Sequence, residues 1–228
     1  MALAGSDFEF TSGSDRVRGY LSLPARGSGP GVIVLQEWWG LVDHIREVCD
    51  RLAREGFVAL APDLYRGESA TDPGAAGRLM MELELPRAGR DLEAAVAALV
   101  NHHAVNGGKV AAIGFCMGGQ LALYAAALSP RISAVVDCYG VHPNVRVDFA
   151  NVRAAVMGVF AERDAFVPPE TAHRLEADLR AAGVRTDFTI YPGVDHAFLN
   201  DSRPDVYDAA TAQRAWARIL AFLRAGLA

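Results

Sequence analysis

The stretch 114–119, Gly-Phe-Cys-Met-Gly-Gly, constrains the fold more than any other part of the chain. An apolar run at 109–113 precedes it, and a helix-like run rich in Leu and Ala follows at 120–128. This order predicts a strand, a tight turn and a helix, with Cys116 at the apex of the turn. Small residues two positions before and after the cysteine, Gly114 and Gly118, allow the sharp turn and leave the thiol open to a substrate.

A cysteine in this position is suited to act as a nucleophile. The helix that starts after Cys116 supplies free backbone N–H groups and a partial positive charge. Both favour a thiolate and a negatively charged reaction intermediate. The alternative is a glycine-rich turn with an inert buried cysteine, since cysteine is often a small core residue. The rest of the chain favours the first interpretation.

The composition limits the class of protein. The chain has 228 residues, 51% of them hydrophobic, and a net charge of −5. We expect a single domain over residues 1–228, with no transmembrane segment and neither nucleic acid nor a membrane as partner. Three widely separated cysteines predict neither a disulfide framework nor a paired metal site, and the segment 1–10 is not a secretory signal. These features favour a reduced, cytoplasmic compartment.

Strand-like and helix-like runs alternate along the chain. Strands are expected at 16–23, 31–35, 57–61, 109–113, 132–138, 154–160 and 186–191. Helices are expected at 41–55, 75–104 with a break near Pro86, 120–128, 168–182 and 205–225. The alternation predicts an α/β fold with a mostly parallel central sheet and helices on both faces. The segment 67–77 is expected to be a mobile surface loop.

A cysteine nucleophile needs a base, and the base needs a third group that orients it. Asp164 follows one predicted strand and His196 follows the last, so both should reach the carboxyl edge of the sheet. The order Cys116, Asp164, His196 is the nucleophile, acid, histidine order of α/β-hydrolases. Asp195 and Glu162 are alternative acids, but the Asp-x-x-Val-Pro turn favours Asp164.

The segment 36–40, Gln-Glu-Trp-Trp-Gly, directly follows another predicted strand. In this fold the loop at that place supplies an oxyanion-hole N–H, so we expect Trp38 to donate together with Met117. Glu37 should face the turn at Cys116 and influence the ionisation of its thiol. The alternative is a surface glutamate beside two tryptophans packed as a lid.

Several other residues are candidates for the pocket or the core. Tyr139 and Phe166 are expected to form pocket walls, together with Trp39. Cys49 and Cys138 are expected in the core. His44 and His173 are expected on helix surfaces.

Five motifs stand out along the chain: residues 36–41 (QEWWGL), 43–46 (DHIR), 59–65 (ALAPDLY), 114–119 (GFCMGG) and 195–198 (DHAF). Together they resemble the dienelactone hydrolase family, whose enzymes are carboxymethylenebutenolidases. The resemblance covers residues from about 10 to the C-terminus. It implies an α/β-hydrolase fold, a catalytic triad of Cys116, His196 and Asp164, and a Glu37 that holds or deprotonates the resting thiol. It implies no metal or organic cofactor.

The resemblance also points to a change in substrate recognition. The founding activity of the family opens an enol-lactone ring, and two arginines bind the carboxylate of the substrate. One of these positions, four residues after the histidine, is Asn200 in this chain. Near the other, Arg78 is the nearest arginine, and Arg203 is a displaced substitute for the first. The carboxylate clamp is therefore altered.

The leading hypothesis is a cysteine-dependent esterase or lactone hydrolase that acts through a thioester on a small-molecule substrate, as a monomer or homodimer. A glutaminase would place a glutamate two residues after His196, where this chain has Phe198. The other alternative is a non-catalytic or redox-sensing protein of the same fold that binds a small ligand, with Cys116 passing through a sulfenic acid.

Overall fold

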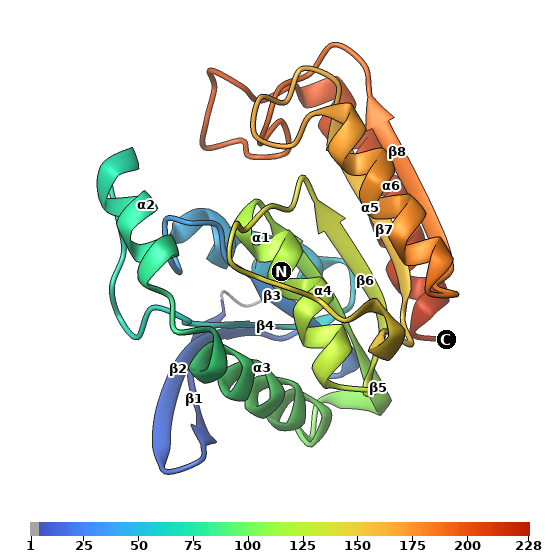
Figure 1. The fold of residues 1–228 in the computed structure, drawn as a ribbon. Coiled ribbons are helices and arrows are strands. Elements are labelled where there is room, and N and C mark those ends of the chain that lie inside the picture. The colour runs from blue at the N-terminus through green and yellow to red at the C-terminus, as the bar shows by residue number, and fades with distance from the viewer. Residues whose placement is uncertain (1–4) are drawn as a thin grey trace.

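The computed structural model describes residues 5–228, in which one eight-stranded sheet has the order β1-β2-β4-β3-β5-β6-β7-β8 (Figure 1). Residues 1–4, the start of the segment expected not to be a signal, lie outside the described residues. The six strands from β3 to β8 are parallel, whereas β1 and β2 run antiparallel to their neighbours. The strands are β1 (Ser6–Ser12), β2 (Asp15–Ser22), β3 (Gly29–Leu35), β4 (Val58–Pro62), β5 (Val105–Phe115), β6 (Ile132–Cys138), β7 (Ala155–Ala161) and β8 (Thr186–Tyr191).

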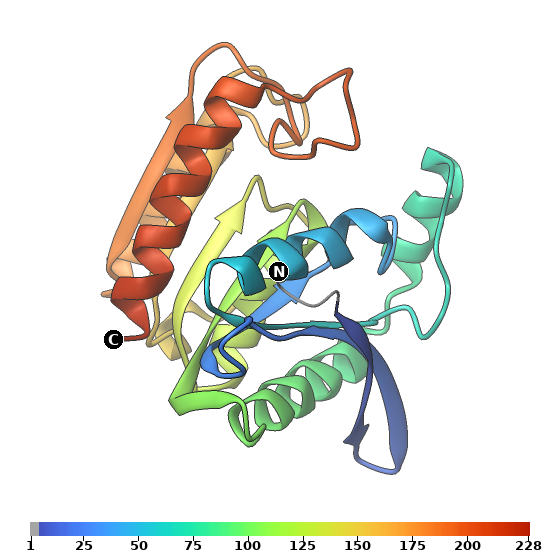
Figure 2. The ribbon, with the colours of Figure 1, turned by 180° about the vertical axis from the view of Figure 1, so that it is seen from behind.

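Helices cover both faces of the sheet, as predicted. Helices α3, α4 and α5 lie on the face toward the viewer in Figure 1, and α1 and α6 lie on the other face, seen in Figure 2. Helix α2 projects from one side of the molecule and buries only Ala76. The helices are α1 (Asp43–Arg54), α2 (Pro73–Glu82), α3 (Leu85–Val100), α4 (Met117–Leu128), α5 (Pro169–Ala181) and α6 (Ala209–Gly226), with a 3₁₀ turn, η1 (Phe149–Asn151).

The core consists of two apolar layers, one on each face of the sheet. Successive residues of the central strands point to opposite faces, so a strand buried on both sides is apolar at every position. On β3, Val32 and Val34 pack toward α1, while Ile33 and Leu35 pack toward α3 and α4. This double burial holds the carboxyl ends of the strands in place. No helix among residues 5–228 is long and apolar enough to cross a membrane.

The strands agree well with the sequence prediction, with one omission. The bounds of β6 and β8 are those predicted, and β5 begins four residues earlier than expected. Strand β1 was not predicted, and it pairs with β2 through a two-residue turn in which Gly13 has a φ of 60°. This edge hairpin lies far along the sheet from the predicted catalytic residues.

The helical region before β5 is divided as predicted, but its start differs. A break at Leu83–Glu84 separates α2 from α3, in which Pro86 lies in the first turn. The prediction of a mobile loop at 67–77 is wrong for its second half, because α2 begins at Pro73. The Asp72 carboxylate accepts a hydrogen bond from the Ala75 N–H at 3.0 Å and caps the helix.

Candidate active site

Cys116 lies at the sharp turn between β5 and α4 with a φ of 51°. The turn is held by backbone hydrogen bonds on both sides of the cysteine. Its N–H donates to the Cys138 carbonyl at 3.0 Å, and its own carbonyl accepts from the Val141 N–H at 3.2 Å. These contacts hold Cys116 in a backbone conformation that is costly for a residue other than glycine.

The two glycines that flank the turn have no room for a side chain. A Cβ on Gly114 would collide with the backbone of Gly118, and a Cβ on Gly118 would lie 2.6 Å from the Gln36 carbonyl oxygen. The turn therefore packs its backbone directly against the end of β3. This close approach explains the glycine spacing noted in the sequence.

We expect Gly118→Ala to lower the free energy of unfolding by about 3 kcal/mol, because the added methyl group meets a rigid backbone carbonyl. Alanine is otherwise favoured over glycine in a helix by about 1 kcal/mol. Gly77→Ala in α2 is the matched control, since its nearest neighbour, Trp38, is 4.0 Å away. Chemical denaturation measures both variants, and equal stability of the two would contradict this account.

His196 and Asp164 meet at the carboxyl edge of the sheet. The Nδ1 atom of His196 lies 2.7 Å from Oδ2 of Asp164. The other oxygen of Asp164 accepts the N–H groups of Phe166 and Val167 at 2.8 and 2.9 Å. Asp164 is 3% exposed, so its carboxylate is fixed on both sides. With Nδ1 occupied, Nε2 is the imidazole nitrogen left for proton transfer.

The two alternative acids have other partners. Asp195 lies 3.2 Å from the Arg163 guanidinium at the surface. The Glu162 carboxylate accepts the Gly193 N–H at 2.8 Å. Only Asp164, of the three acids considered, hydrogen-bonds His196.

The loop after β3 is fixed against the loop after β4. Gly40 has a φ of 97° and forms a bridge with Ser69, and the Trp39 carbonyl accepts the Ala70 N–H at 2.9 Å. This arrangement turns Glu37 inward, where its side chain is 2% exposed. Its carboxylate accepts a hydrogen bond from the Asn200 amide at 3.2 Å. Glu37 is therefore not a surface residue.

The electrostatics of the thiol and of Glu37 are linked. Burial, and after it the Glu37 carboxylate, raises the pKa of Cys116 to about 12, while the backbone N–H groups of Met117 and Trp38 act to lower it. Burial likewise raises the pKa of Glu37 to about 7, against the lowering effects of His196 and Arg203. With a pKa of about 12, the resting thiol of Cys116 is protonated at neutral pH.

A cavity of about 430 Å³ opens at this place. Cys116 and His196 both line it, and most of its wall is apolar. Phe166 is 62% exposed and lies next to His196, with 5.1 Å between the ring centres and 60° between the ring planes. The cavity is lined by Trp38, Trp39, Pro73, Met80, Cys116, Val141, Phe166, His196 and Arg203.

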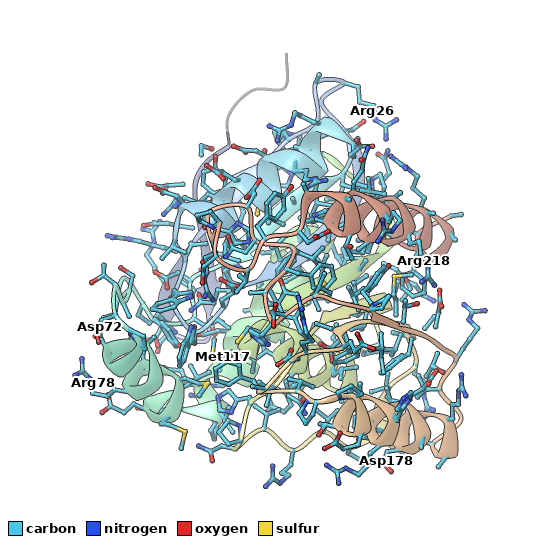
Figure 3. The ribbon with its side chains drawn as sticks, turned by 90° about the horizontal axis from the view of Figure 1, so that it is seen from above. Arg26, Asp72, Arg78, Met117, Asp178 and Arg218 are labelled. Atoms are coloured by element: carbon cyan, nitrogen blue, oxygen red, sulfur yellow. The ribbon has the colours of Figure 1, made fainter. Side chains whose placement is uncertain are left out.

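The remaining predicted residues fall in different places. Arg203 lines the cavity and pairs with Asp205 at 2.6 Å. Tyr139 is fully buried behind His196, with 4.9 Å between their ring centres, and is not among the lining residues. Arg78 is exposed on α2 and also does not line the cavity; Figure 3 shows it at the edge of the molecule, with Met117 near the middle.

The prediction that His44 lies on a surface is wrong. Its side chain is 6% exposed and packs against Phe115, the strand residue that precedes Cys116. His173 is exposed, as expected, and Cys49 and Cys138 are buried in the core.

Sequence reasoning missed several neighbours of the site. Pro73 and Met80 lie on α2, and Val141 lies in the loop after β6. None of them belongs to a motif, so nothing in the sequence marked them. Asp137 is buried behind the turn, where burial raises its pKa to about 7 and one oxygen accepts the Gly140 N–H at 2.7 Å. Among residues 5–228, no group of three or more histidine, cysteine or acidic side chains could hold a metal ion.

Comparisons with known proteins show the family of the chain. The family model described as "Dienelactone hydrolase family" matches residues 17–227. "Protein usf" of Aquifex pyrophilus is 39% identical over 96% of this chain and 98% of its own length. A protein of Aquifex aeolicus that carries a provisional carboxymethylenebutenolidase name is 37% identical over the same shares.

Solved structures show the same fold. The dienelactone hydrolase-like promiscuous phosphotriesterase P91 from metagenomic libraries superposes with a TM-score of 0.87 at 27% identity, covering 100% of both chains. An esterase of Thermogutta terrifontis, solved with propionate bound, has a TM-score of 0.70 at 18% identity, covering 96% of this chain and 94% of its own. The latter likeness concerns the fold alone.

Proposed function

Because the chain belongs to the dienelactone hydrolase family, we propose that it hydrolyses a small ester or lactone by nucleophilic attack of Cys116, with His196 as base and Asp164 as the group that orients the base. The observation that carries the proposal is the convergence at one cavity of Cys116, at the start of α4, and an imidazole that is hydrogen-bonded at 2.7 Å to a buried carboxylate. These are the parts that acyl transfer requires.

The reaction follows from these parts. His196 accepts the thiol proton at Nε2, and the sulfur attacks the carbonyl carbon of the substrate. The N–H groups of Trp38 and Met117 hold the negatively charged oxygen, each worth roughly 3 kcal/mol in the transition state. The imidazolium then protonates the leaving alcohol or enol, which leaves a thioester on Cys116. Water activated by His196 hydrolyses the thioester, and Asp164 keeps the imidazole in the required tautomer throughout.

The cavity favours an apolar substrate. Two tryptophans, a phenylalanine, a methionine and a valine form most of its wall, and Arg203 is the one arginine that lines it. Arg203 is already paired with Asp205, and Asn200 stands where the family resemblance places an arginine. We therefore propose that the preferred substrate is a small uncharged ester or lactone, with a dienelactone carboxylate as a poorer substrate.

The resting state of the thiol favours the hydrolase over a redox sensor. Peroxide oxidises thiolates, and sensors have low thiol pKa values. A pKa of about 12 keeps the resting Cys116 protonated. The thiolate would then form only when a substrate is bound and His196 accepts the proton.

The test of the proposed function is a substrate comparison. Initial rates are measured for a neutral aryl ester, for the same ester carrying a carboxylate on its acyl chain, and for a dienelactone. We expect the neutral ester to give the highest kcat/KM. Absence of turnover with all three would refute the hydrolase, and a preference for the two carboxylates would refute the proposed specificity.

Glu37→Gln tests the effect of the carboxylate on the thiol. Glu37 raises the pKa of Cys116, so its neutralisation should lower that pKa and speed alkylation by iodoacetamide at pH 8. The rate should rise about tenfold for each unit by which the pKa falls. Glu68→Gln, an exposed carboxylate, is the control. An unchanged alkylation rate in Glu37→Gln would show that Glu37 does not govern the thiol.

A further inference from the structure

Asn200 is a buried amide next to the proposed site. It lies four residues after His196, and its side chain is 2% exposed. The loop that carries it is held by backbone hydrogen bonds: the Asn200 N–H donates to Ala197 at 2.9 Å, and its carbonyl accepts from Arg203 at 3.1 Å. The position of this side chain is therefore well defined by its backbone.

Ser202 determines which end of the amide faces Glu37. The Oδ1 atom of Asn200 accepts the Ser202 hydroxyl at 2.6 Å and the Ser202 N–H at 3.0 Å. A flipped amide would place its NH₂ group against the backbone N–H, which is also a donor. The NH₂ group therefore points the other way and donates to Oε2 of Glu37 at 3.2 Å. The amide end is thus assigned by its network of partners.

Glu37 needs such a donor because it is buried. An isolated carboxylate in an apolar setting is strongly disfavoured in its charged form. Burial raises the pKa of Glu37, and His196, Arg203 and the Asn200 hydrogen bond lower it, in that order. The titratable or charged groups that face Glu37 from the elements packed around it are Cys116, Cys138, Tyr139, His196 and Arg203.

We propose that Asn200 is a positioning residue for Glu37: its amide, oriented by Ser202, donates to one oxygen and so stabilises the ionised carboxylate next to Cys116. The inference deepens the proposed function, because the thiol on which Glu37 acts is the proposed nucleophile. The amide donates to Glu37 without adding a charge, so Asn200 contributes to setting the pH at which Glu37 becomes ionised beside the thiol.

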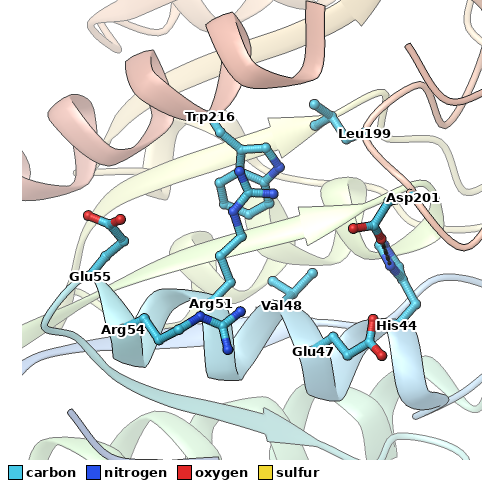
Figure 4. A pocket seen from close by; sticks show the side chains of 9 residues that line it. All are labelled: His44, Glu47, Val48, Arg51, Arg54, Glu55, Leu199, Asp201 and Trp216. Carbon is cyan, nitrogen blue, oxygen red and sulfur yellow. Dashed lines mark ion pairs between the residues drawn. The ribbon is translucent and has the colours of Figure 1, made fainter. Parts of the chain in front are cut away.

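The next residue of the loop points away from the site. Asp201 faces His44 of α1, with 3.7 Å between its Oδ1 and the imidazole Nδ1, in a surface cavity that Arg51 and Trp216 also line (Figure 4). Two successive side chains of the loop therefore point in different directions: Asn200 contacts the buried Glu37, and Asp201 contacts His44 of α1. Only the former reaches Glu37.

The sign of the expected pH effect follows from the raised pKa of Glu37. Its folded-state pKa is about 7, against 4.5 for the ordinary group. The free energy of unfolding therefore falls as the pH rises from about 4.5 through 7, because Glu37 ionises less readily in the folded protein than in the unfolded chain. Removal of the Asn200 donor raises the folded-state pKa further, so the loss continues to higher pH.

The test is a double-mutant cycle in the full-length chain: wild type, Asn200→Leu, Glu37→Gln and the double variant. The free energy of unfolding is measured by urea denaturation at several pH values from 5 to 9. We expect Asn200→Leu to be less stable than the wild type, by an amount that grows between pH 6 and 9. The unfolding equilibrium constant should rise about tenfold, relative to the wild type, for each unit by which the substitution raises the pKa of Glu37. In the Glu37→Gln background the deficit should be the same at every pH.

Two further variants sharpen the test. Ser202→Ala removes the hydroxyl but keeps the backbone N–H, so its pH-dependent deficit should be smaller than that of Asn200→Leu. Asn144→Leu changes a loop asparagine whose side-chain amide lies 4.0 Å from the Met81 sulfur, and it should show no pH-dependent deficit. A pH-independent deficit for Asn200→Leu in both backgrounds would overturn the proposal and leave Asn200 a purely structural residue.

The readout does not depend on turnover. A pH-dependent deficit that vanishes with Glu37→Gln, in a protein that hydrolyses no ester, would support the positioning role and refute the hydrolase. Ester hydrolysis together with a pH-independent deficit would support the hydrolase and refute the positioning role of Asn200.

Discussion

Replacement of Cys116 by alanine is expected to lower kcat/KM for a neutral aryl ester by about 10⁴-fold or more, because the bond to the acyl group can no longer form. The change removes only the sulfur. The backbone hydrogen bonds of the turn, from the Cys116 N–H to Cys138 and from Val141 to the Cys116 carbonyl, need no side chain. Stability should therefore change little while activity is lost, and initial rates together with a denaturation curve measure the two effects.

Cys49→Ala is the matched control for this variant. Cys49 is buried in α1, and burial raises its pKa far above the ordinary value, so it is inert. We expect Cys49→Ala to lose some stability by leaving a small cavity and to retain its activity. Residual activity of Cys116→Ala within tenfold of the wild type would contradict nucleophilic catalysis by Cys116.

Asp164→Asn is expected to lower kcat by about 10⁴-fold, through the tautomer of His196. The Oδ1 atom of the new asparagine would keep the N–H groups of Phe166 and Val167, so its NH₂ group would face His196. The imidazole must then accept at Nδ1 and carry its proton on Nε2. In that tautomer Nε2 cannot take the proton of the thiol, although the geometry of the site is preserved.

Asp195→Asn separates the two neighbouring acids. Asp195 pairs with Arg163 at the surface and is about half exposed, and an exposed ion pair contributes about 0–1 kcal/mol. We expect kcat of this variant to remain within a few-fold of the wild type. A larger loss in Asp195→Asn than in Asp164→Asn would show that Asp195, and not Asp164, orients the base.

Local patterns in the sequence were enough to predict the centre of the fold. Strands β6 and β8 are continuous apolar or alternating runs with clear ends, and their bounds were predicted to the residue. The glycine spacing around Cys116 has a steric cause, because a side chain at Gly114 or Gly118 would collide with neighbouring backbone atoms. Strong local constraints of this kind are visible in one sequence because they depend on few neighbours.

Other features depend on tertiary contacts and could not be predicted. His44 belongs to a charged helix turn, and only its packing against Phe115 buries it. Asn200 contacts Glu37 across 163 positions of the chain. Helix α2 begins at an Asp-Pro pair that signals a helix start as well as a turn, and the loop composition before it obscured that signal.

Intact-mass spectrometry during turnover of a slowly hydrolysed aryl ester tests the central claim most directly. We expect a transient mass increase equal to the acyl group, on the peptide that contains Cys116, and no such increase in Cys116→Ala. Turnover without this adduct in rapidly quenched samples, or an acyl group on a different residue, would contradict covalent hydrolysis by Cys116.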